Sequence, residues 1–216
     1  MSIEINIFAS QELYSNSQLQ APEVAKNYLT QALNDTEFGF DISTPNVQYD
    51  ANDSDPNLDD FAATIQTEHP DLWAKDSNHL LVSGKADPIG AAGRRASYSD
   101  DGGVIAGMSS TTTQTEMYNT PEGAAIHGTL HEVGHELLYD SDVNDHKRGD
   151  NWVEYDPEYP TIGQYYVTPM LADHASKWSE NGCQHDLVNP SDYSSFYRSM
   201  LWADCMTKKI SPKDPV

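Results

Sequence analysis

A helical segment with two histidines four residues apart constrains this chain more than any other feature of its sequence. The segment begins at Thr120-Pro121-Glu122, where a capping threonine, a proline suited to the first helical position and an acidic residue occur together. The motif HEVGH follows, from His131 to His135. Residues i and i+4 lie about one turn apart on one helix face, so both imidazoles can reach one point. We therefore expect a helix that runs to about Tyr139 and carries both imidazoles on one side.

A different face of this helix is apolar. Gly134, inside the motif, disfavours a helix by roughly 1 kcal/mol relative to alanine, and its presence indicates close packing by another backbone. The apolar face consists of Ile126, Leu130, Val133 and Leu137. The pattern predicts a helix held against a core, with its histidines turned toward a separate site.

Two imidazoles at this spacing are typical of a zinc site, because zinc takes histidine nitrogen at ~2.0–2.1 Å. Glu132 follows the first histidine and points off the helix axis toward the open coordination position. There it can take a proton from the attacking water and pass it to a leaving amine. A shuffled chain of this composition would contain the motif only about 0.02 times, which excludes chance but leaves a structural or vestigial metal site as the alternative.

The HEVGH motif resembles that of the zincin metallopeptidases, and the layout around it is similar to that of the metzincin clan. That clan has an N-terminal α/β lobe, the zinc helix, a third ligand and a methionine-containing turn beneath the metal. The resemblance implies a zinc metalloendopeptidase with one catalytic zinc ion and a peptide or protein substrate. The clan's pattern HExxHxxGxxH is not followed: Leu138 replaces its glycine and Ser141 its last ligand. Without that glycine the helix can continue past His135.

The third ligand is therefore expected beyond a longer loop. We favour His146, because neutral imidazole is a better zinc ligand there than a carboxylate surrounded by other carboxylates. Asp142 and Asp145 are alternatives in the same segment. A gluzincin, the thermolysin-like class, would instead use Glu154.

Met170, in a Thr-Pro-Met triplet, resembles the methionine of the metzincin turn; a methionine that fills a core gap is the alternative. His127 lies one turn before His131 and is either a partner of the ligands or part of a cleft wall. One of several tyrosines could stabilise the oxyanion, as tyrosines do in some zincins. The candidates are Tyr155, Tyr159, Tyr165 and Tyr166.

Hydrophobic periodicity predicts an α/β (α+β) fold of one domain, residues 1–216, with an N-terminal subdomain over about 1–140 and a C-terminal one over about 141–216. The resemblance implies a metzincin-like form: an N-terminal mixed sheet with helices, the zinc helix, and a mostly irregular C-terminal part with a final helix. By analogy with the clan, an extended peptide would add to the strand over 102–110. The expected elements are a strand over 3–7, a helix from Ala21, an interrupted strand over 38–50, a helix from Asp55, strands over 78–84 and 102–110, and a last helix from Ser191.

The charge of the chain excludes several kinds of partner. It has 34 acidic and 12 basic residues and a net charge of −22. Such a field repels nucleic-acid phosphates and anionic lipids, so we expect neither nucleic acid nor a membrane as partner. Dense carboxylates also repel one another unless salt screens them. The composition is similar to that of halophilic proteins, such as haloarchaeal ones, with an ordinary acidic protein as the alternative.

Calcium is a further candidate cofactor, from a short acidic stretch before the second helix. Leu58 stands where a calcium loop requires glycine and Thr64 where it requires glutamate, so a solvated helix start is the better interpretation. The stretch contains Asp53, Asp55 and Asn57.

Two further features concern the compartment. The start of the chain lacks a charged region and an apolar region, so we expect an intracellular protein or a secreted one whose leader is absent. Cys183 and Cys205 either form one disulfide or remain two buried thiols, and the sequence leaves both open.

Overall fold

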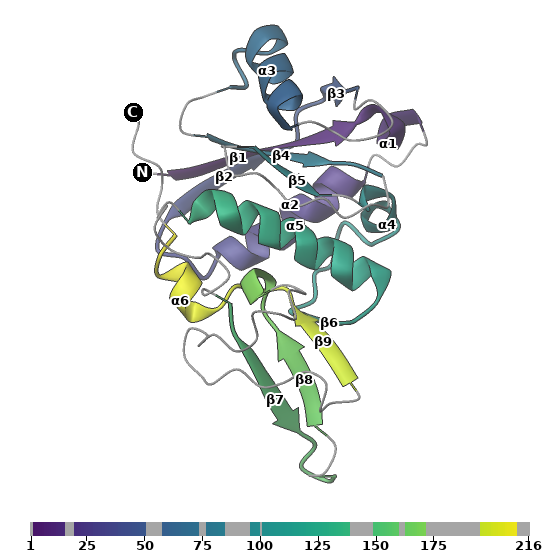
Figure 1. Ribbon diagram of the computed structural model, residues 1–216, viewed down its shortest axis with the longest axis vertical. Helices are drawn as coiled ribbons and strands as arrows, with labels where there is room; N and C mark the ends of the chain where they lie inside the picture. The colour runs from purple at the N-terminus through teal and green to yellow at the C-terminus, as the bar shows by residue number, and fades with distance from the viewer. Residues whose placement is uncertain are drawn as a thin grey trace.

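Strand β1 (Ser2–Ser10) is the centre of the first sheet (Figure 1). It pairs in parallel with β2 (Gly39–Ser43), β3 (Gln48–Tyr49) and β4 (Ser77–Val82), and β4 pairs in parallel with β5 (Ala96–Ser99). The computed structural model describes residues 2–15, 20–50, 58–73, 77–84, 96–99, 101–138, 149–159, 163–171 and 195–210. All described strand pairs of this sheet are parallel, so the mixed sheet expected in the N-terminal part is not seen among them.

Helices cover both faces of the first sheet, as parallel sheets require (Figure 1). Helices α2 (Ala21–Leu33) and α5 (Pro121–Leu137) lie on one face, and α3 (Leu58–Glu68) lies on the other. The alternation of β1 explains this arrangement: Ile5 and its alternate neighbours face α2 and α5, whereas Phe8 packs with the apolar residues of α3. The apolar face predicted for each of the helices α2 and α5 is therefore buried.

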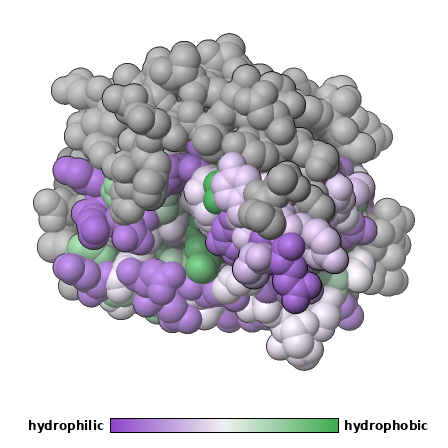
Figure 2. Space-filling view, turned by 90° about the horizontal axis from the view of Figure 1, so that it is seen from below, coloured by the Kyte–Doolittle hydropathy of each residue, from purple (hydrophilic) through white to green (hydrophobic). Residues whose placement is uncertain are grey.

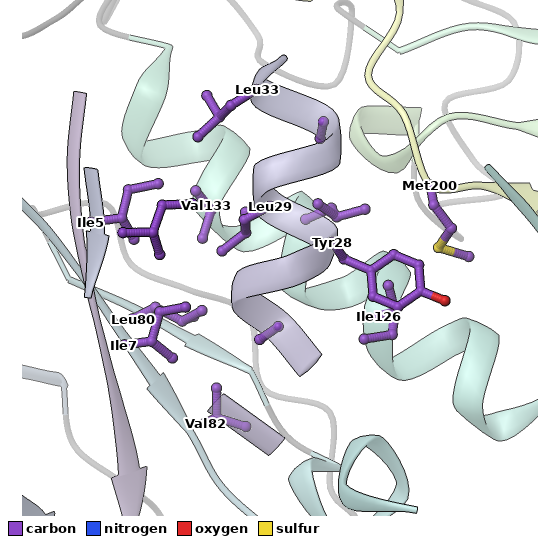
Figure 3. Close-up of a cluster of buried hydrophobic side chains, with 14 of the residues drawn as sticks. Ile5, Ile7, Tyr28, Leu29, Leu33, Leu80, Val82, Ile126, Val133 and Met200 are labelled. Atoms are coloured by element: carbon purple, nitrogen blue, oxygen red, sulfur yellow. The ribbon is translucent and has the colours of Figure 1, made fainter. Parts of the chain in front are cut away.

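The main core lies between the sheet, α2 and α5 (Figure 3). Tyr28, fully buried, places its hydroxyl 3.6 Å from the sulfur of Met117. The cluster includes Ile5, Ile7 and Leu80 from strands, Leu29 and Leu33 from α2, and Ile126 and Val133 from α5. This core also contains Trp202 and Met206, so residues on both sides of position 140 share it.

The N-terminal expectations are largely confirmed. Helix α2 has proline in its first turn, strands β2 and β3 are separated at Pro45, and β4 follows the predicted apolar run. Helix α1 (Gln11–Ser15) is an additional short element. The expected cap of α3 at Asp55, with the candidate calcium residues Asp53 and Asn57, lies outside the described residues.

The strand expected over 102–110 is wrong, because α4 (Gly102–Ala106) occupies its start. Asp101 has a left-handed φ of 65°, which turns the chain out of β5. Gly102 then approaches β4 so closely that a Cβ would lie 2.8 Å from the carbonyl oxygen of Ser83. The segment on which we expected a peptide to add is therefore helical at its start.

A second sheet forms on the other side of α5, below it in Figure 1. Its order is β6 (Glu116–Tyr118), β9 (Ser195–Ser199), β8 (Gly163–Val167) and β7 (Asn151–Tyr155). The β8–β9 pair is parallel and the two outer pairs are antiparallel. The expected irregular C-terminal part is therefore wrong for the described residues.

The final helix expected from Ser191 is also wrong. Residues Ser195–Ser199 form β9, and only the short α6 (Asp204–Thr207) follows it. Phe196 and Tyr197 point to opposite faces of the second sheet, where they stack on Tyr165 and Tyr166 of β8. Cross-strand aromatic stacking therefore overrides the helical spacing of the apolar residues.

The surface agrees with the composition. On the face seen from below, the described residues are mostly hydrophilic or intermediate in hydropathy, and the most strongly apolar ones lie in a narrow central strip (Figure 2). No helix among the described residues is long and apolar enough to cross a bilayer.

Candidate metal centre

Helix α5 begins as the sequence predicts. The hydroxyl oxygen of Thr120 accepts a hydrogen bond from the amide of Gly123 at 3.2 Å, and Pro121 is the first helical residue. The helix ends at Leu137, because Leu138 adopts an extended backbone (φ −89°, ψ 92°) and is buried. The helix thus continues past His135, as expected without the clan's glycine, and ends two residues before the expected limit of about Tyr139.

His131 and His135 converge at one point on α5. Their Nε2 atoms are 3.0 Å apart, and the ring planes are inclined by 87°. Two nitrogens bound to one zinc ion in tetrahedral geometry, with bonds of ~2.0–2.1 Å, would be about 3.3 Å apart. The spacing of the two imidazoles therefore fits a shared metal ion.

The ring of His131 is oriented by a backbone carbonyl. Its Nδ1 atom lies 2.6 Å from the carbonyl oxygen of Pro169. A carbonyl only accepts, so Nδ1 carries the proton and Nε2 keeps a lone pair that points toward His135. This is the tautomer that a zinc ligand needs, and hydrogen bonds of this kind accompany metal-bound histidines.

Met170 lies beneath the motif. It is fully buried in the 3-10 turn η2 (Pro169–Leu171), and its sulfur would overlap a Cβ added at Gly134. The same Cβ would come within 2.9 Å of the terminal carbon of Met206. Close packing at Gly134 is thus confirmed, but side chains approach it rather than the expected backbone.

Two carboxylates accompany the histidines. Glu132, which lies between the two histidines in the sequence, is half-buried. Glu136, adjacent to His135, is 4% exposed and is not among the residues that the sequence motif indicates. The sequence does contain a sign of this burial: Glu136 lies three residues after the apolar Val133, so helical spacing places it near the inward face of α5.

The favoured third ligand, His146, lies outside the described residues, as do Asp142 and Asp145. The described chain resumes at Gly149, where a Cβ would overlap the backbone of Leu171, so this position lies against η2. Asp150 continues this contact, since its carbonyl oxygen accepts from the amide of Thr168 at 3.0 Å.

Glu154 has a different position. It is exposed on β7, and its carboxylate accepts a hydrogen bond from the indole of Trp152 at 3.1 Å. Within the described part of the chain, no three His, Cys, Asp or Glu side chains come together as a potential metal site. The structure therefore does not bring Glu154 to the histidine pair.

His127 is a partner of Arg198. The ring is 1% exposed, and its Nδ1 lies 3.3 Å from Nη1 of Arg198. Burial lowers the pKa of His127 well below its usual value, and the charges of Arg198 and His131 lower it further; backbone hydrogen bonds at Val167 and Thr168 oppose the shift. His127 therefore stays neutral and accepts from the arginine.

The four tyrosines fall into two groups. Tyr155 and Tyr159 are more than half exposed, whereas Tyr165 and Tyr166 are buried in β8. The hydroxyl oxygen of Tyr165 accepts a hydrogen bond from the side-chain amide (Nδ2) of Asn151 at 2.8 Å. Burial, with the charges of Glu116 and Glu154 and the neighbouring Tyr197, raises the pKa of Tyr166 to about 12, so this hydroxyl remains a donor.

The C-terminal segment is fixed to α5 from below. The indole nitrogen of Trp202 donates to the carbonyl oxygen of Leu130 at 3.1 Å. Cys205, beside Met206, is disulfide-bonded, and Cys183, the chain's second cysteine, lies outside the described residues. The structure thus favours the disulfide over two free thiols.

The sequence matches no protein-family model and no curated protein. The case for a function therefore rests on the geometry of this centre.

Proposed function

We propose that the chain is a zinc-dependent endopeptidase of metzincin-like architecture. The observation that carries the proposal is the convergence of the His131 and His135 Nε2 atoms at 3.0 Å. A hydrogen bond to Pro169 orients the first ring, and Met170 lies beneath Gly134 between the two histidines. An α/β lobe precedes α5, as the proposal expects, although its described strand pairs are all parallel rather than mixed.

In this proposal His131, His135 and His146 hold one zinc ion. When bound, the ion would polarise the scissile carbonyl and acidify the attacking water. Glu132, half-buried beside the histidines, takes the proton of that water as general base and returns it to the leaving amine. Met170 forms an apolar floor that keeps the histidine helix at a fixed depth.

His146 is retained as third ligand in this proposal because a neutral imidazole is a better zinc ligand there than a carboxylate surrounded by other carboxylates. Among the described residues, Gly149 lies against Leu171, the residue after Met170.

A gluzincin-type peptidase with Glu154 as third ligand is the first alternative. The exposed position of Glu154 on β7, with its hydrogen bond to Trp152, does not favour it. A non-catalytic zinc-binding protein is the second alternative. Glu132 argues against it, since a structural site needs no base next to its ligands.

The proposal is tested with Glu132→Gln, which keeps the shape of the side chain but removes the base. Cleavage of casein and of a quenched-peptide set is measured at molar NaCl, together with bound zinc. Glu158→Gln is the matched control, because Glu158 is an exposed carboxylate in the β7–β8 hairpin. We expect the Glu132 variant alone to lose activity while retaining zinc. A zinc-loaded wild type that cleaves no peptide would point to the non-catalytic alternative.

A further inference from the structure

Arg198 is a buried cation at the point where the second sheet meets α5. It lies in the central strand β9, paired with Met117 of β6 and Val167 of β8, and its side chain is 5% exposed. A guanidinium always carries its charge, so burial requires hydrogen-bond acceptors that hold it in one orientation.

The guanidinium of Arg198 donates hydrogen bonds to one residue just before α5 and to one residue within it. Its Nε donates to Oδ1 of Asn119 at 3.2 Å, and its Nη1 donates to Nδ1 of His127 at 3.3 Å. Asn119 directly precedes the capping residue of the helix, and His127 lies about two turns further along. The central carbon also lies 5.0 Å from the ring centroid of Phe196. Arg198 thus fixes the N-terminal half of α5 to β9.

Arg198 is also connected, through neighbouring residues, to both groups of the hydrogen bond that orients His131. Val167, its neighbour across the sheet, is the last residue of β8, and Pro169 follows two residues later. The helix partner His127 is one turn before His131. The hydrogen bond between His131 and Pro169 is 2.6 Å long. Arg198 is connected to His131 through the shared helix α5, and to Pro169 through the pairing of β9 with β8.

We infer that Arg198 is a positioning residue for the metal centre: its hydrogen bonds to Asn119 and His127 set α5 against β9 and the paired strand β8, and so set the ring orientation of His131. The inference rests on the proposed function, because it predicts an effect on zinc. Hydrogen-bonded partners of metal ligands typically affect metal affinity 10–100-fold, and Arg198 acts one step further out.

The test compares Arg198→Met, which removes the charge and both hydrogen bonds, with Arg198→Lys, which keeps the charge but lacks the planar fork. Phe61→Leu is the control for general destabilisation, because Phe61 is fully buried on the opposite face of the first sheet. Zinc dissociation constants are measured by chelator competition on the full chain. The visible spectrum of the cobalt-substituted protein reports on ligand geometry.

We expect both Arg198 variants to bind zinc about tenfold more weakly and to shift the cobalt bands. Phe61→Leu should lower stability and leave both readouts unchanged. The inference is overturned if Arg198→Met binds zinc within twofold of wild type, if Arg198→Lys behaves as wild type, or if Phe61→Leu weakens binding equally.

A wild type that binds no zinc would overturn the proposed function and leave the inference testable. Because the Nδ1 proton of His131 is hydrogen-bonded to the carbonyl of Pro169, we expect it to give a slowly exchanging nuclear magnetic resonance signal in the metal-free protein. Arg198→Met should speed the exchange of this proton with solvent at least tenfold. An unchanged exchange rate would overturn the positioning role.

Discussion

Gly134 of α5 lies directly on the sulfur of Met170, so closely that the space for a β-carbon is already occupied. The helix that carries both histidines and the turn whose carbonyl orients His131 are thus in contact at a second point. A side chain at position 134 would have to displace the sulfur of Met170, which belongs to a flexible but fully buried side chain. The depth of α5 and the orientation of its first histidine are therefore coupled.

Gly134→Ala is expected to destabilise the protein, although alanine favours a helix by roughly 1 kcal/mol. The added Cβ would meet the flexible ends of Met170 and Met206, but both side chains are fully buried, so their displacement should cost about 1–3 kcal/mol and outweigh that gain. Urea unfolding measures the change. Gly128→Ala in the same helix is the control, because no atom lies within 4 Å of its added Cβ. It should stabilise the protein, and equal effects at both positions would contradict the packing explanation.

The third ligand is decided by two alanine variants. His146→Ala should abolish stoichiometric zinc binding, whereas Glu154→Ala should retain it, because Glu154 is exposed on β7 with its carboxylate on Trp152. Zinc per chain is counted after gel filtration. Retained zinc in His146→Ala would show that another residue is the ligand, and Asp142→Ala and Asp145→Ala would then be compared.

The elements around the first core are predictable because their apolar residues follow a single period. The isoleucines of β1 alternate strictly, and α5 combines a cap, a first-turn proline and one apolar stripe. Strand β9 is not predictable in this way. Phe196, Tyr197 and Met200 fit a helical stripe, and only pairing with β8 and β6, distant in sequence, makes the segment a strand.

The candidate site shows the same limit. The histidine pair follows from local spacing alone, since helix geometry places i and i+4 together. The acceptor of His131 is a backbone carbonyl 38 residues away, which has no signature in the sequence. The contact between His127 and Arg198 spans 71 residues, so the role of either side chain appears only once the two sheets are placed around α5.

Acid is expected to destabilise the protein partly through His127. Its folded-state pKa is lowered by burial and by Arg198, so the unfolded chain binds the extra proton first as the pH falls. The contribution of His127 to the free energy of unfolding is therefore fully present above about pH 6.5. Below that pH it declines, by up to about 1.4 kcal/mol per pH unit. Urea unfolding of metal-free His127→Gln should show a shallower decline than wild type. His69→Gln is the control, because His69 lies outside the buried cores, and its unfolding should show the same decline as wild type.

Salt should stabilise the fold. With 34 acidic and 12 basic residues, mutual repulsion opposes compaction, and molar salt shortens the Debye length from ~10 Å at 0.1 M to ~3 Å. We expect the free energy of unfolding to rise steadily from low salt to molar NaCl. Unfolding is best followed by heat at several NaCl and KCl concentrations, because both salts screen charge equally. A midpoint independent of salt would show that the carboxylates are spaced widely enough to be tolerated in dilute buffer, as in an ordinary acidic protein.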